Sequence, residues 1–175
     1  MNRRLSLMTT LVVLMVTGFW GFTTNAQQQV KTADDPISKL EGLWQGEGKF
    51  FGMDASAQAR WEWILGGKFL RLSIRYEMKT PDGKKQTFEG HGYYPPKGNG
   101  KYLGRWFDSQ GNSYPIQGTW ENGTLTSMWG ESENYNGKSV YRLSAAEKML
   151  EVTDFTKQKD GSWKEFSNFK LTPGK

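Results

Sequence analysis

The segment FLRLSIRYEMKTPDGKKQTFEGHGYY, residues 69–94, contains the pattern that decides the fold of this chain. In its first half, apolar side chains stand at every second position from Leu70 to Met78, with mostly polar or charged ones between them. A period of two with one apolar face is typical of a β-strand that covers a core. The turn residues PDG at 81–83 then predict a tight hairpin, and 86–94 predicts the returning strand.

The same succession of strand and turn extends through the rest of the chain after Gly42. Ten strands are predicted, at about 43–51, 55–64, 69–79, 86–94, 101–107, 114–121, 124–131, 138–144, 149–157 and 163–172. No long helical segment separates them, which excludes parallel crossovers and predicts an up-and-down antiparallel order. We therefore expect an all-β fold, a closed antiparallel β-barrel of about ten strands. Closure removes exposed edges and leaves room inside for one small ligand.

The chain before the barrel has two predicted parts. Residues 1–26 have the features of an export signal, with Arg3 and Arg4 at its charged end, an apolar stretch after them and a small-residue cleavage site at 24–26. The arginine pair leaves both the general and the twin-arginine export routes open. Residues 27–39 predict a polar leader with a short helical turn, and 40–175 the barrel domain.

The helical turn is predicted from its capping residues. Asp34 or Asp35 would be the N-cap, Pro36 suits the first turn, and Gly42 can end it. The expected location of the mature protein is the periplasm or the outside of the cell. No Cys follows the signal as a lipid anchor, and we expect no stable membrane insertion once the signal is removed.

The composition excludes several classes of function. The sequence has no Cys and a single His, which excludes disulfides, thiolate metal sites, Cys nucleophiles and any pair of imidazoles. The formal net charge is only +5 and no basic run exceeds 84–85, so we expect no nucleic-acid partner. No metal, other cofactor or catalytic residue is predicted, and the sequence sets no oligomeric state.

The aromatic residues carry the functional prediction. The chain has 8 Trp, 7 Tyr and 10 Phe, and several of them fall on the apolar faces of predicted strands. Large rings with polar N–H and O–H groups favour a pocket over a sealed core, and we expect Gly90, Gly92 and Gly118 to leave room between them. A barrel that the rings fill completely is the alternative. The predicted ligand-binding residues are Trp61, Trp63, Tyr76, Phe88, Arg105, Trp120, Trp129 and Tyr141.

Four segments, taken in order, resemble an uncharacterised bacterial family of lipocalin-like (calycin) proteins, a domain of unknown function. They are LEGLWQGEG at 40–48, LGGKFL at 65–70, GKYLGRWFDS at 100–109 and GTW at 118–120. The resemblance spans about residues 40–172 and implies a calycin-type barrel with a small apolar or aromatic ligand. It implies no established activity and no catalytic residues.

The opening G-x-W-x-G-x-G at 42–48 also resembles nitrobindin, a ten-stranded haem barrel. That resemblance implies a His near the C-terminus that holds the iron. Here no His follows His91, so we expect no haem.

Two other functions are consistent with the sequence. A calycin-type isomerase, cyclase or esterase would use His91, Glu89 or Asp154 as its base, although strand alternation places His91 on the polar outer face. A solid-packed barrel would be a structural or interaction module of the cell envelope. We favour an exported protein that holds a small hydrophobic or aromatic molecule inside the barrel.

We expect the exported protein to begin at Gln27, because the small residues at 24–26 form the predicted cleavage site. N-terminal sequencing of protein recovered from outside the cytoplasm checks this. A chain that still starts at Met1 and stays in the membrane fraction would contradict the export signal.

Overall fold

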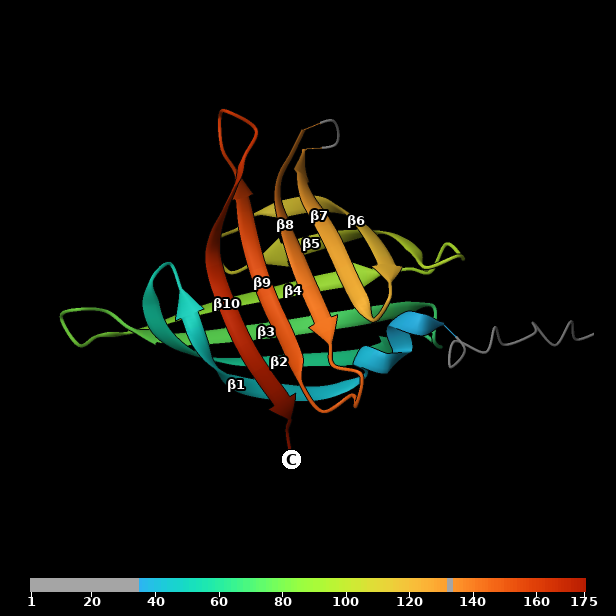
Figure 1. The fold of residues 1–175 in the computed structure, drawn as a ribbon, viewed down its shortest axis with the longest axis horizontal. Helices are drawn as coiled ribbons and strands as arrows, with labels where there is room; N and C mark the ends of the chain where they lie inside the picture. Colours follow the sequence, from blue (N-terminus) through green and yellow to red (C-terminus); the bar gives the residue numbers. More distant parts are fainter. Residues whose placement is uncertain (1–34, 132–133) are drawn as a thin grey trace, which may run out of the picture.

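The computed structural model describes residues 35–131 and 134–175. They form ten antiparallel strands that close into one barrel, in which each strand pairs with its neighbours in sequence and β1 pairs with β10 (Figure 1). The strands are β1 (Gly42–Phe50), β2 (Met53–Ile64), β3 (Phe69–Lys79), β4 (Lys85–Tyr94), β5 (Lys101–Asp108), β6 (Ser113–Glu121), β7 (Thr124–Glu131), β8 (Asn134–Leu143), β9 (Leu150–Lys157) and β10 (Trp163–Pro173). The predicted fold class is confirmed, whereas the predicted export signal lies outside the described residues.

Strand alternation sets the two faces of the barrel wall. On β3, every second side chain from Leu70 to Met78 is buried, as the sequence pattern predicts. On β2, small side chains alternate inward from Ala55 to Ala59 and are followed by Trp61, which is completely buried. The core is therefore the interior of the barrel, and the charged positions between these residues form its outer face.

Two glycines of β1 allow the barrel to close. Gly46 and Gly48 lie beside the backbone of β10, and a Cβ added at either position would overlap the carbonyl oxygen of Lys170 or Asn168. Because any larger residue would force the two strands apart, the G-x-G pattern of β1 serves the close approach of the closing strands.

A short 3₁₀ helix, η2 (Pro36–Leu40), covers one end of the barrel beside the start of β1 (Figure 1). Asp35 is its N-cap and accepts a hydrogen bond from the backbone N–H of Ile37, which confirms the predicted helical turn. Ile37 and Leu40 are completely buried, and the indole Nε1 of Trp44 donates to the Leu40 carbonyl at 2.8 Å. We call this the helix end of the barrel.

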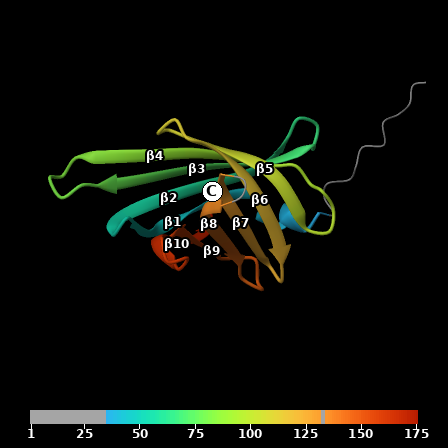
Figure 2. The same cartoon turned by 90° about the horizontal axis from the view of Figure 1, so that it is seen from above.

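The opposite end is left open where β4 and β5 separate. These strands pair only from Gly90 opposite Asp108 to Tyr93 opposite Arg105. The first half of β4 continues past this point together with β3, so the β3–β4 hairpin projects beyond the barrel wall (Figure 2). We call this the open end.

Part of the segment between the predicted strands 124–131 and 138–144 proves to be strand. Asn136 and Gly137 carry a typical turn sequence, but both lie within β8, which begins at Asn134. The reason is a packing contact, because the ring of Trp129 on β7 lies where a Cβ of Gly137 would be. Glycine here permits a large ring to lie against the backbone of the neighbouring strand.

We expect Gly90→Ala to lower the free energy of unfolding by about 1–3 kcal/mol, because its Cβ would overlap the ring of Trp106. The matched control is Gly118→Ala, also on a strand, whose Cβ would lie 3.3 Å from Leu125 and Tyr102 and needs only small shifts. Chemical denaturation of the protein measures both. Equal losses of stability would contradict the packing of Trp106 against β4.

Candidate functional site

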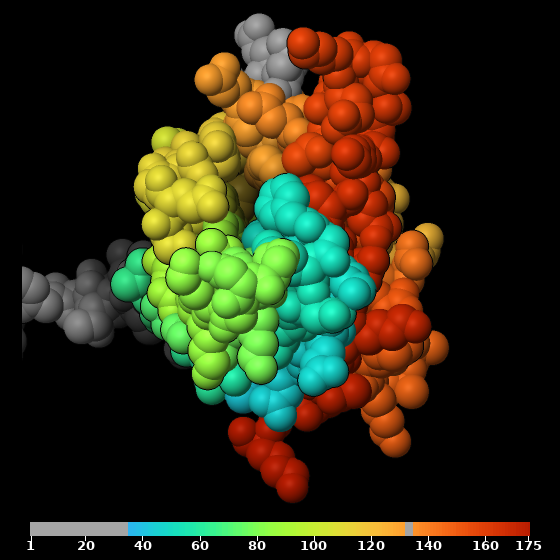
Figure 3. Space-filling model, turned by 90° about the vertical axis from the view of Figure 1, so that its left-hand side faces the viewer, coloured from blue at the N-terminus to red at the C-terminus, as the bar shows by residue number. Residues whose placement is uncertain are grey.

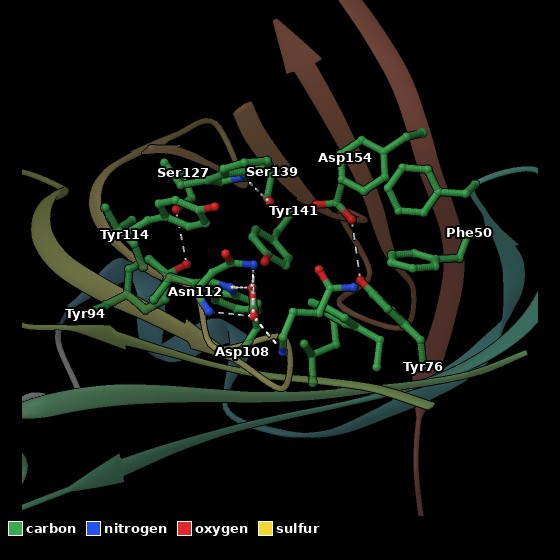
Figure 4. Close-up of a pocket in the computed structure, with 18 residues that line it drawn as sticks. Phe50, Tyr76, Tyr94, Asp108, Asn112, Tyr114, Ser127, Ser139, Tyr141 and Asp154 are labelled. Atoms are coloured by element: carbon green, nitrogen blue, oxygen red, sulfur yellow. Dashed lines mark hydrogen bonds between the residues drawn. The ribbon is translucent and has the colours of Figure 1, made fainter. Parts of the chain in front are cut away.

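A cavity of about 200 Å³ lies inside the barrel and is reached from the open end (Figure 4). Figure 3 views this end, with the β1–β2 turn, the β3–β4 hairpin and the β5–β6 turn around it. The mouth is formed by Phe51 from the first of these turns and by Gln110 and Asn112 from the last. Phe166 completes it, at the position where the register of β10 shifts against β9. The site is a pocket open at one end.

Phenylalanine and tyrosine rings from β1, β3 and β4 form one wall of the cavity. The Phe50 ring lies 4.9 Å from that of Tyr76 and 5.5 Å from that of Phe88, measured between centroids. Behind them, Phe169 stacks on Tyr76 at 4.6 Å. At the rim, the exposed ring of Phe51 stacks on Phe166 at 4.7 Å. These contacts hold the wall in one arrangement.

Tryptophan and tyrosine rings from β5, β6 and β7 form the facing wall. The Trp129 ring lies 6.0 Å from that of Tyr114. Trp129 Nε1 donates to the Ser139 hydroxyl at 3.2 Å, and Trp106 Nε1 donates to the Asp108 carboxylate at 3.2 Å. Since both indole N–H groups have partners in the barrel wall, the rings stay in place beside an open space.

Asp154 on β9 brings a carboxyl group into the interior. Its residue is 6% exposed, and Figure 4 shows the carboxyl directed toward Tyr76, whose hydroxyl donates to it at 3.5 Å. Burial raises the pKa of Asp154, and the neighbouring hydroxyls of Ser139, Ser167 and Tyr76 oppose that shift only in part.

The tyrosines around this carboxyl are also buried. Burial raises the pKa of Tyr76 and of Tyr141 well above the usual range, and the Asp154 charge adds to both shifts. Burial likewise raises the pKa of Tyr94 to about 12, and its hydroxyl lies 3.1 Å from that of Ser127. All three phenols are therefore neutral hydrogen-bonding groups at physiological pH.

Asp108, the other carboxyl of the cavity, has a structural task. Its oxygens accept hydrogen bonds from the backbone N–H groups of Gln110 and Asn112 at 3.0 and 3.1 Å. They also accept from the Asn112 amide and from Trp106 Nε1. These bonds shape the β5–β6 turn at the mouth, as an Asp at the start of a tight turn does.

Of the eight residues predicted to bind a ligand, four line this cavity. They are Tyr76, Phe88, Trp129 and Tyr141. Trp61 lies deeper, with its ring 5.5 Å from that of Tyr94 and 5.2 Å from that of Tyr141. It packs beneath the cavity instead of lining it.

The other three lie elsewhere. Trp63 is at the helix end, where its Nε1 donates to the Ser38 hydroxyl at 3.2 Å. Trp120 is near the same end and packs against the core. Its backbone N–H donates a hydrogen bond to the carbonyl of Gly100. Arg105 is on the outer face, and its Nε donates to the Ser113 hydroxyl. Side chains also occupy the space beside Gly90, Gly92 and Gly118 that was expected to stay free: the rings of Trp106, Tyr94 and Tyr102, and Leu125.

Sequence reasoning did not single out the polar residues of the interior as binding residues. Ser127, Ser139 and Asp154 are all buried, and each takes an inward position in an alternating strand. Asp154, for example, follows inward Leu150 and Val152 at the period of two. A polar residue at a position that strand alternation assigns to the inward, apolar face was thus the sequence signal that could have identified these binding candidates.

His91 lies outside the barrel, as its position in the alternation predicts. The side chain is exposed, and its Nδ1 lies 3.1 Å from the Ser73 hydroxyl. Because the only His of the chain is on the far side of the wall from the cavity, the lining does not fit a haem held by histidine. Within residues 35–131 and 134–175, no cluster of His, Cys, Asp and Glu could hold a metal ion, and no helix could span a membrane.

The fold and the cavity define a closed, ten-stranded antiparallel β-barrel protein with a pocket inside it. No protein-family model matches the chain, and no curated protein matches it. Among solved structures, the chain is similar to Rv2717c from M. tuberculosis, with a TM-score of 0.57 and 14% sequence identity. The similarity covers 79% of this chain and 95% of that one, and at this identity it shows the fold alone.

We expect the stability of the protein relative to its Asp154→Asn variant to fall as the pH rises from about 4 to 7. The folded pKa of Asp154 is raised above 3.8, so the folded state holds the proton more tightly than the unfolded chain does. The stability that Asp154 contributes in this way is complete below the pKa that it has in the unfolded chain. It is lost as the pH rises through the pKa that it has in the folded protein.

Thermal unfolding of both proteins across this pH range measures the effect. The matched control is Asp54→Asn, which makes the same chemical change at a side chain that is 89% exposed. A difference between wild type and Asp154→Asn that stays constant with pH would contradict the raised pKa.

Proposed function

We propose that the mature chain is an exported protein that binds a small hydrophobic or aromatic molecule in the barrel cavity. Export rests on the signal pattern of residues 1–26. Binding rests on one observation, a cavity of about 200 Å³ lined by aromatic rings and open at one end. A barrel that served only as a structural element would gain stability by filling such a space, because unfilled volume in a core is destabilising.

The two walls suit a flat ligand. Aromatic groups prefer stacked or edge-to-face contacts at centroid separations of roughly 4.5–7 Å, and both walls are built of aromatic rings. Each square ångström of apolar surface that the ligand buries contributes about 25 cal/mol. Because the rings are held by mutual packing and by hydrogen bonds to the wall, little ordering accompanies binding.

The rim supports the same proposal. Phe51 is 62% exposed although it stacks on Phe166, and both residues line the cavity mouth. An apolar pair at this place would contact the outer part of a bound molecule, which would cover it from water. The pair therefore extends the apolar surface of the cavity to its mouth.

The geometry favours binding over the calycin-type enzyme. Of the three candidate bases, His91 and Glu89 are on the outer face, where Glu89 pairs with Arg75. Only Asp154 lines the cavity, and the groups that contact it are the hydroxyls of its neighbours. The other carboxyl of the cavity, Asp108, accepts hydrogen bonds from the β5–β6 turn, so it is poorly placed to act as an acid or base together with Asp154.

We expect the neutral probe N-phenyl-1-naphthylamine to bind saturably, with its fluorescence rising as it enters apolar surroundings. Trp129→Ala should weaken this binding at least about tenfold, since it removes a large ring from one wall of the cavity. The matched control is Trp120→Ala, which removes a partly buried Trp that does not line the cavity. Equal effects of the two substitutions, or no binding to the wild type, would contradict the proposed function.

A further inference from the structure

Asp154 is the part of the cavity that hydrophobic binding does not use. An aromatic pocket needs no carboxyl group, and burying one costs stability unless a partner compensates for its charge. The described residues that line the cavity include Asp154 and Asp108 but no Lys, Arg or His. The interior thus carries acidic groups with no basic group of its own beside them.

The hydrogen bonds of the two carboxyls separate their roles. Asp108 accepts bonds from two backbone N–H groups, an amide and an indole, so the β5–β6 turn and Trp106 occupy its oxygens. Asp154 has hydroxyl neighbours, those of Ser139, Ser167 and Tyr76, and the hydrogen bond from Tyr76 is long at 3.5 Å. An ionised carboxylate can accept about four hydrogen bonds, so Asp154 has capacity for a strong donor.

The rings beside Asp154 suit the same kind of donor. Tyr76 and Tyr141 line the cavity with Asp154, and Phe50 lies 4.9 Å from Tyr76. The face of an aromatic ring attracts a cation, and the attraction grows where water is excluded. Aromatic rings around one buried carboxyl form an environment that suits an ammonium group.

We propose that the cavity selects small amines, with the ammonium group of the ligand paired to Asp154 and its apolar body held between the two aromatic walls. This inference rests on the proposed function and names the ligand class. The ammonium replaces the missing basic partner of Asp154, and a charge-assisted hydrogen bond of this kind is stronger than a neutral one. Asp108, nearer the mouth, adds negative charge along the path of the ligand.

Binding should then depend on pH through Asp154. The titratable groups that face it are Tyr76 from β3, Tyr94 from β4 and Tyr141 from β8, with Asp108 at the mouth. Burial raises the pKa of each of these phenols, so they stay neutral in the range tested. An ammonium ligand favours the ionised form of Asp154. Its affinity should therefore rise with pH, by up to about tenfold per unit below the pKa of that group.

Isothermal titration calorimetry with three phenyl compounds tests the inference. The probes are 2-phenylethylamine, its neutral analogue 2-phenylethanol and the anion phenylacetate, which share one ring and differ in the polar group. We expect the amine to bind at least about tenfold more tightly than the alcohol at pH 7.5, the anion to bind most weakly, and the preference for the amine to shrink as the pH is lowered toward the pKa of Asp154. Asp154→Asn should abolish the preference, and the surface control Asp54→Asn should keep it.

Each outcome has a distinct meaning. If the alcohol binds as tightly as the amine, or if neither binds while N-phenyl-1-naphthylamine does, the amine inference is wrong and the proposed function stands. If the naphthyl probe also fails to bind, both are wrong. Should Asp154→Asn not fold, the pH dependence of amine binding to the wild type decides alone, and an affinity that is flat or falls with rising pH overturns the inference.

Discussion

The pairing of β1 with β10 is the constraint on which the rest of the structure depends. It joins the first and last strands over seven residues, from Trp44 opposite Pro173 to Phe50 opposite Ser167, and turns a meander into a barrel. Gly46 and Gly48 make it possible, because a side chain at either place would meet the β10 backbone. Without this closure the two aromatic walls would not face each other, and Asp154 would not be enclosed.

Much of the fold could be predicted from the sequence, since a period of two assigns each residue to a face of the sheet. The pattern does not give a residue's height along the barrel axis, which follows from how ten strands are staggered against one another. Trp61 and Trp63 on β2 and Tyr76 on β3 were assigned to one interior, yet Trp63 lies at the helix end and Tyr76 at the cavity. Asn136-Gly137 shows a second limit, because the same dipeptide that favours a turn also suits a strand covered by the ring of Trp129.

The polar groups of the interior explain why so many tryptophans and tyrosines can line one cavity. Trp129 and Tyr94 each have a serine hydroxyl within hydrogen-bond distance, and Trp106 has the Asp108 carboxylate. Aliphatic residues could pack the barrel without such partners. The chain has instead combined large rings with serines at inward positions, which keeps the rings ordered around a space that they do not fill.

The projecting β3–β4 hairpin has a consequence for how copies of this protein behave at high concentration. Because β5 pairs with β4 only from Gly90 onward, the first residues of β4 present a strand edge that the barrel does not cover. Such edges are templates for adding a strand from another molecule. Lys79 and Lys85 are paired across this hairpin, with Lys84 beside them in the turn. Two like charges placed opposite each other weaken the hairpin slightly, but they also repel the same segment of a second copy. The charges that loosen this tip therefore protect the protein from edge-to-edge aggregation.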